Sequence, residues 1–123
     1  MKLRAAVILM SVPIAALFWN LGSNVNLVLI HLVFPIFWGV AIGFWWLGVS
    51  WWLRASGLVA VVIVCETLRA VVYGLEAGWE YVTSDIVAQY LMLYSLAAQL
   101  VVASVTLVVA GAVATRRRQR HAA

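Results

Sequence analysis

The sequence has 123 residues, of which 67% are hydrophobic and 10% charged, and its mean hydropathy is +1.08. A soluble domain is nearer half apolar and a quarter charged, and one of this length could not bury so many apolar side chains. The composition therefore excludes an ordinary soluble domain and predicts an all-α integral membrane protein. The net charge of +4 does not indicate nucleic-acid binding, because the basic residues flank apolar runs.

Four apolar runs predict a four-transmembrane-helix bundle that forms a single membrane domain over residues 1–123. A helix rises about 1.5 Å per residue and the hydrocarbon layer is about 30 Å thick, so about 20 residues suffice to cross it. Helices are required because lipid offers no partner to backbone N–H and C=O groups. In chain order the predicted spans cover residues of about 5–21, 25–49, 55–75 and 86–115, and a basic tail follows at 116–123.

The first span follows two basic residues, Lys2 and Arg4, which is also how a signal peptide begins. The apolar run continues through Pro13 to Trp19 without a small-x-small cleavage site. We therefore expect this segment to remain in the protein as a helix.

The second span contains a candidate ligand or cofactor contact, formed by His31, Trp38 and Trp45 on nearly the same helix face. A histidine in this position could ligate haem or hydrogen-bond a quinone. Haem held by two axial histidines needs a second intramembrane histidine, and the other histidine of this chain, His121, is in the tail. A helix-packing hydrogen bond is therefore the main hypothesis for His31, and no cofactor is expected, with haem or quinone as the alternative.

Tryptophans gather where the second span ends, beside Arg54. They are Trp45, Trp46, Trp51 and Trp52. Indole rings favour the headgroup level of a membrane, so this cluster predicts an interfacial belt. A docking face for a partner helix is the alternative interpretation.

Two charged residues, Glu66 and Arg69, lie three residues apart inside the third apolar run. Charges within a lipid-spanning helix are costly and mark a buried pair, a polar pathway or a partner contact. On a helical wheel a polar stripe within an arc of about 80° is formed by Glu66, Arg69, Tyr73, Glu76 and Glu80. Three hypotheses follow: Arg69 extends outward to pair with Glu76, or the ion pair joins helices of this chain, or it contacts a second protein or a ligand.

A second polar face runs along the fourth span within an arc of about 120°. It contains Asp85, Gln89, Ser95, Gln99 and Thr106. Both polar faces begin at the link 76–85, so a hairpin of these two spans would bring Gln89 and Gln99 alongside Glu66 and Arg69. We therefore predict a buried polar network between the third and fourth spans.

The remaining motifs are sparse. Gly39 and Gly43 form a GxxxG pattern, which permits close helix approach. Cys65 is the single cysteine and we expect it to pack as a small hydrophobe, with no metal site. The sequence has no Ser/His/Asp set, phosphate-binding glycine loop or HExxH motif, so we expect a protein that is not an enzyme.

The basic residues outside the spans fall on one side of the four-span order. They are Lys2, Arg4, Arg54, Arg116, Arg117, Arg118 and Arg120, whereas the opposite links, 20–26 and 76–85, contain none. The positive-inside rule predicts a multi-pass protein of the bacterial inner (plasma) membrane with both termini in the cytoplasm. We expect the arginines of the tail to contact lipid headgroups, and any homo-oligomer to be parallel.

These patterns favour a non-catalytic small membrane subunit or accessory protein, which docks in a larger membrane complex through its polar helix faces and its tryptophan cluster. Its expected partners are membrane lipids and other integral membrane proteins or a parallel homo-oligomer. The alternative is a small parallel-oligomeric transporter or channel in which Glu66, Arg69, Gln89 and Gln99 line a polar path. A third hypothesis is a quinone-, lipid- or haem-binding subunit that uses His31. One mutually neutralising pair makes a poor conduction path, which favours the first hypothesis.

Overall fold

The computed structural model describes residues 2–19, 29–84 and 86–122, and 94% of the described residues are helical. No strand occurs among them, so the prediction of an all-α fold is confirmed. The elements in chain order are α1 (Lys2–Trp19), the π-helical segment η1 (Leu29–Val33), α3 (Phe34–Trp45), α4 (Trp51–Ala77), α5 (Trp79–Ser84) and α6 (Ile86–Ala122).

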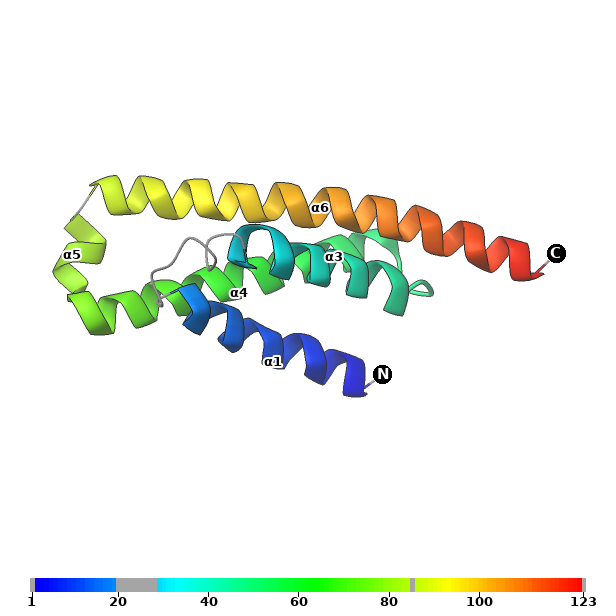
Figure 1. Cartoon of the computed structure of the whole chain (residues 1–123), viewed down its shortest axis with the longest axis horizontal. Coiled ribbons are helices and arrows are strands. Elements are labelled where there is room, and N and C mark those ends of the chain that lie inside the picture. The colour runs from blue at the N-terminus through cyan, green and yellow to red at the C-terminus, as the bar shows by residue number, and fades with distance from the viewer. Residues whose placement is uncertain (1, 20–28, 85, 123) are drawn as a thin grey trace.

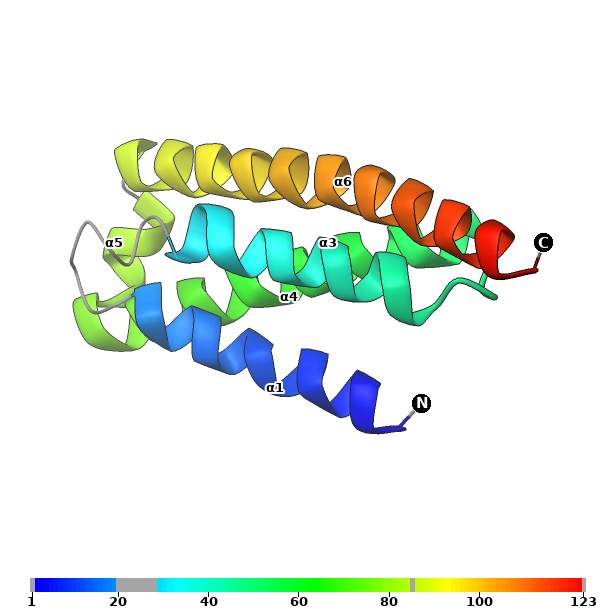
Figure 2. The same ribbon diagram turned by 45° about the vertical axis from the view of Figure 1, so that its right-hand side comes forward.

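The helices lie side by side in an elongated bundle (Figure 1). Helices α4 and α6 run in opposite directions along its length, and the short α5 connects them at one end (Figures 1 and 2). Helix α3 packs mainly against α6, and α1 mainly against α4. Both termini and the connection from α3 to α4 lie at the end opposite to α5.

Two helices are long and apolar enough to cross a membrane. The qualifying stretches are Trp51–Glu76 in α4, with 26 residues, and Gln89–His121 in α6, with 33 residues. In each, 28% of the most apolar window is buried inside the protein. Most of the side chains on these two helices therefore face outward.

The first, third and fourth predicted spans correspond to α1, α4 and α6, and the second corresponds to η1 together with α3. Several of their boundaries differ from the prediction. The second helix ends at Trp45 rather than near residue 49, and α6 continues through the predicted tail to Ala122. Arg, Gln and Ala are good helix formers, so α6 has no local reason to stop at Thr115. Residues 20–28, which hold the end of the first predicted span, the link 20–26 and the start of the second span, lie outside the described residues.

Helix α4 ends at a glycine corner. Gly78 has a φ of 99°, and its N–H donates to the carbonyl oxygen of Gly74 over 3.0 Å. Glycine adopts this left-handed conformation without steric cost, which makes it a common helix terminator. The chain then enters α5, so Glu80 is not on α4, and the prediction that it extends the polar stripe of that helix is wrong.

Helices α3 and α6 approach closely at the GxxxG pattern. A Cβ atom placed on Gly39 would lie 2.8 Å from the carbonyl oxygen of Ala103 and 2.8 Å from Cβ of Thr106. A Cβ on Gly43 would lie 2.9 Å from Cβ of Ala110. The two glycines therefore let the α3 backbone pack directly on α6, as small residues do between membrane helices.

The core lies along the line where the four main helices meet. Its members include Trp38 and Val62, both 0% exposed, and Leu107 at 2%. Cys65 is also part of this core and is 2% exposed, in keeping with its expected packing role.

Candidate functional site

A buried ion pair lies within α4. Nη2 and Nε of Arg69 lie 2.7 Å and 3.1 Å from Oε2 of Glu66. The two residues are one helical turn apart, so α4 alone sets this geometry. The side chains are 7% and 10% exposed for Arg69 and Glu66, respectively. An arginine that extended outward toward Glu76 would be exposed, so the enclosed position of Arg69 contradicts that hypothesis.

Helix α6 supplies two hydrogen-bond donors to the other carboxylate oxygen. Oγ of Ser95 donates to Oε1 of Glu66 over 3.0 Å, and Nε2 of Gln99 donates to the same oxygen. Ser95 is 4% exposed and Gln99 is 0% exposed. Each oxygen of Glu66 thus accepts two hydrogen bonds, which uses the acceptor capacity of an ionised carboxylate.

The segment η1 adds His31 to this cluster. Nε2 of His31 lies 2.9 Å from Oγ of Ser95. The single hydroxyl proton of Ser95 is donated to Glu66, so Nε2 of His31 must be the donor in this contact. We call Glu66, Arg69, Ser95, Gln99 and His31 the polar network. It joins α4, α6 and η1.

The π-helical geometry of η1 has a local cause. Pro35 has no N–H, and its ring would clash with the carbonyl of the residue four positions earlier, which is His31. A wider turn before Pro35 relieves that clash, and such π-type turns are frequent at functional sites. The same turn positions the imidazole of His31 toward α6.

Of the five residues predicted as an intramembrane polar or partner-binding set, Arg69 and Gln99 hydrogen-bond to Glu66, and Gln89 lines the same groove as Glu66. Tyr73 lies one turn beyond Arg69 on α4 and is partly buried. Gln89 is on the exposed surface of α6. Asp85, at the start of the predicted second face, lies outside the described residues.

A groove of about 440 Å³ lies between α4 and α6 beside the polar network. Glu66, Thr67 and Gln89 are the polar residues among those that line it. Its other lining residues are apolar: Ile63, Ala70, Met92, Leu93 and Leu96. The groove therefore combines an apolar floor with a few polar groups, and it opens on the outer surface of the bundle. We call it the α4–α6 groove.

The tryptophans predicted beside His31 contact α1. Trp38 is fully buried, and its Nε1 donates to Oγ of Ser11 over 2.8 Å. Nη1 of Arg4 donates to the carbonyl oxygen of Trp45 over 3.2 Å, and its guanidinium carbon lies 5.8 Å from the ring centroid. The contact of His31 with Ser95 is a hydrogen bond between helical segments, the kind of contact predicted for His31. Within the described part of the chain, no three His, Cys, Asp or Glu side chains are grouped to hold a metal ion.

The arginines expected to contact lipid headgroups lie on the last turns of α6. They are Arg116, Arg117, Arg118 and Arg120, and all four are exposed. This part of α6 projects beyond the other helices (Figure 1).

Ser95 was predicted on the polar face of the fourth span but not among the partner-binding residues, and Ser11 was not predicted at all, although both make buried hydrogen bonds. Ser95 carried a signal, because it lies four residues before Gln99 on the same helix face. Ser11 carried none, since its partner Trp38 is 27 residues away in another helix. Comparison with known proteins finds no matching family model, no similar curated protein and no similar solved structure.

Proposed function

We propose that this chain is a four-span integral membrane protein of the bacterial inner membrane that docks with other membrane proteins as a non-catalytic subunit. The outward faces of α4 and α6 support the membrane location. Only 28% of the most apolar window of each helix is buried inside the chain, so most of its apolar surface is exposed. An exposed apolar surface of this extent is stable when lipid or another protein covers it. Exposed examples on α6 are Leu91, Leu93, Val101, Val105 and Val109.

The distribution of charge along the bundle supports both termini being cytoplasmic. The end that holds the two termini also holds Lys2, Arg4, Arg54 and the four arginines on the last turns of α6. The opposite end carries Glu76 and Glu80. Basic residues concentrate on the cytoplasmic side of membrane proteins, so this arrangement favours that orientation.

Cysteine labelling tests the orientation. In a Cys65→Ala background, a single cysteine replaces either Glu80 or Gln119, which are exposed near opposite ends of the bundle. We expect a membrane-impermeant maleimide to label Glu80→Cys in intact cells and Gln119→Cys only after permeabilisation. Labelling of both positions, or of neither, in intact cells would contradict the four-span topology.

The observation that carries the docking proposal is the internal pairing of the polar network. Arg69, Ser95 and Gln99 are enclosed by the chain itself, which gives little support to a polar conduction path through them. The α4–α6 groove remains as a mostly apolar surface on the outside of the bundle, lined by residues such as Ile63, Leu93 and Leu96. Membrane helices associate by close van der Waals packing, and a groove of this kind offers a partner helix such a packing surface. Met92 adds an adaptable apolar surface.

A bulky substitution in the groove tests this docking surface. Leu93 lines the groove and is 61% exposed, so Leu93→Trp should fill the groove without disturbing the core. We expect native mass spectrometry in mild detergent to find the wild-type chain bound to a second, different polypeptide, and Leu93→Trp to lose it.

Val109→Trp is the matched control for that variant. Val109 is 56% exposed on α6 and lies about 160° around the helix from Leu93, so Val109→Trp should retain the partner. A wild-type spectrum with only one kind of chain, or equal loss of the partner in both variants, would overturn the docking proposal.

A further inference from the structure

A pocket of about 380 Å³ lies between the beginning of α4 and the last turns of α6. Trp51 and Arg54 line it from α4, and Thr115 and Arg116 line it from α6. Its other lining residues are small or apolar: Val108, Gly111 and Ala112. Two arginine side chains therefore share one pocket.

Arg54 has buried donor atoms without an acceptor. Its Nε and Nη1 are fully buried and make no hydrogen bond within the protein. Buried donors of this kind are nearly always paired in folded proteins, because an unpaired one keeps its full desolvation cost. The guanidinium carbon lies 5.5 Å from the ring centroid of Trp51, which stabilises the charge without pairing its N–H groups.

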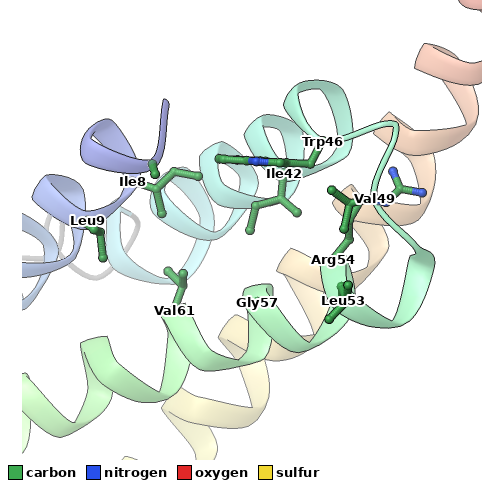
Figure 3. A pocket seen from close by; sticks show the side chains of 10 residues that line it. Ile8, Leu9, Ile42, Trp46, Val49, Leu53, Arg54, Gly57 and Val61 are labelled. Atoms are coloured by element: carbon green, nitrogen blue, oxygen red, sulfur yellow. The ribbon is translucent and has the colours of Figure 1, made fainter. Parts of the chain in front are cut away.

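The Arg54 side chain extends from α4 toward α6. Arg54 also contributes to the lining of a second, apolar pocket of about 330 Å³, whose other residues include Ile8, Ile42 and Val61 (Figure 3). The Arg54 guanidinium is directed away from these side chains and toward α6. A Cβ atom on Gly111 of α6 would lie 3.7 Å from Nη1 of Arg54. Nη1 is therefore covered by protein close to α6, and Arg54 lines the pocket shared with Arg116 from the α4 side.

The described charges around this pocket are all positive. Arg54 lies in the first turn of α4, where the helix dipole is also positive, and the N-cap Ser50 makes no side-chain capping bond. The next carboxylate along α4 is Glu66, about 18 Å away by helix rise, and it is already paired with Arg69. An anion placed between Arg54 and Arg116 would neutralise both guanidinium groups and relieve the repulsion between the two cations. Phosphate oxygens fit the planar fork of a guanidinium especially well.

We propose that this pocket holds the phosphate group of an anionic phospholipid between Arg54 and Arg116. The inference rests on the membrane location proposed above. Below the pocket, α6 presents the exposed side chains of Val101, Val105 and Val108 on one helix face, which suits an acyl chain better than water. Basic pockets between helices on the cytoplasmic side of membranes commonly bind anionic headgroups.

Lipid retention tests the site. The chain is purified in mild detergent and incubated with phosphatidylglycerol or with phosphatidylcholine of the same acyl chains, and native mass spectrometry counts the bound lipids. We expect phosphatidylglycerol to be retained in preference to phosphatidylcholine. Arg54→Gln should lower that retention at least about tenfold, because it removes charge-assisted hydrogen bonds from a guanidinium to the phosphate as well as one positive charge.

Arg118→Gln is the matched control, because it removes the same charge from α6 at a position that does not line the pocket. It should lower retention of phosphatidylglycerol much less than Arg54→Gln does, because it removes only a general surface charge. Arg54→Lys, which keeps the charge but loses the planar fork, should give an intermediate value with an unchanged thermal unfolding temperature. If Arg54→Gln fails to fold, Arg116→Gln removes the other guanidinium and should also lower retention.

Equal retention in wild type and Arg54→Gln, or equal loss in Arg118→Gln, would overturn the site. Displacement of the lipid by millimolar inorganic phosphate would overturn the phospholipid as occupant and assign the pocket to a free anion. The same measurements are made on Leu93→Trp, the variant expected to lose the partner, so they do not depend on a bound partner protein. Failure of the cysteine labelling or of partner binding would therefore leave a positive lipid result interpretable.

Discussion

Replacing Gly39 with valine is expected to separate α3 from α6 and to lower the free energy of unfolding by about 3 kcal/mol, the upper end of the usual cost of overpacking. The first added carbon would lie 2.8 Å from the backbone oxygen of Ala103, which cannot rotate away as a side chain can. The two further carbons of valine would meet Thr106, whose Cβ is equally close. Thermal unfolding in mild detergent, followed by tryptophan fluorescence, measures the effect.

Gly57→Val is the control for that experiment. Gly57 lies in α4, and no atom would come within 4 Å of a Cβ placed there. Valine has a better helix propensity than glycine, so this variant should unfold at the wild-type temperature or slightly above it. If Gly39→Val were as stable as Gly57→Val, the close approach of α3 to α6 would not exist.

Arg69→Leu is expected to destabilise the protein by about 3–5 kcal/mol, because it leaves the Glu66 carboxylate buried without its cation. The double variant Glu66→Leu with Arg69→Leu should be milder than this single change. It removes both charges together, and replacement of a buried ion pair by apolar side chains is often neutral. Part of the loss should remain in the double variant, because Ser95 and Gln99 lose the carboxylate to which they donate.

Glu76→Leu provides the comparison for these variants. Glu76 lies near the end of the same helix and is exposed, so its replacement should change the free energy of unfolding by less than about 0.5 kcal/mol. A double variant less stable than Arg69→Leu would mean that the two charges do not act as a structural pair. The polar network would then be better explained by an interaction outside this chain.

Sequence periodicity was sufficient for the helices and for the part of the polar network that α4 and α6 contribute. Glu66 and Arg69 share a face of one helix, and Gln99 lies on a polar face of the next long helix, so their meeting follows from a simple hairpin of α4 and α6. The glycine pair 39–43 likewise indicated a close helix contact. These are local patterns, in which a period of 3.6 residues determines which side chains point the same way.

Other features depend on how separate helices are rotated and placed, which local patterns do not encode. The bond from His31 to Ser95 joins residues 64 positions apart, and it also depends on the wide turn before Pro35. Glu80 was wrongly placed on the polar stripe of α4, because the helical-wheel analysis assumed that the helix continues through Gly78. The backbone turns at that glycine. The unpaired nitrogens of Arg54 could not be predicted from the sequence, because the burial of individual atoms depends on how α4 packs against α6.

The position of both charges of the ion pair on α4 has a consequence for the order of events during synthesis. A pair split between two helices would leave each helix to enter the membrane with an uncompensated charge, at about 2.5–3.5 kcal/mol apiece on insertion scales. Arg69 and Glu66 are one turn apart, so their ion pair can form within α4 alone. The apolar length of α4 is then electrically neutral as soon as the helix forms. Ser95 and Gln99 lie downstream in the chain and reach the carboxylate only afterwards. In the proposed membrane setting, α4 would thus insert with its two charges already paired. Helix α6 would then be aligned on α4 by the hydrogen bonds of Ser95 and Gln99 to Glu66.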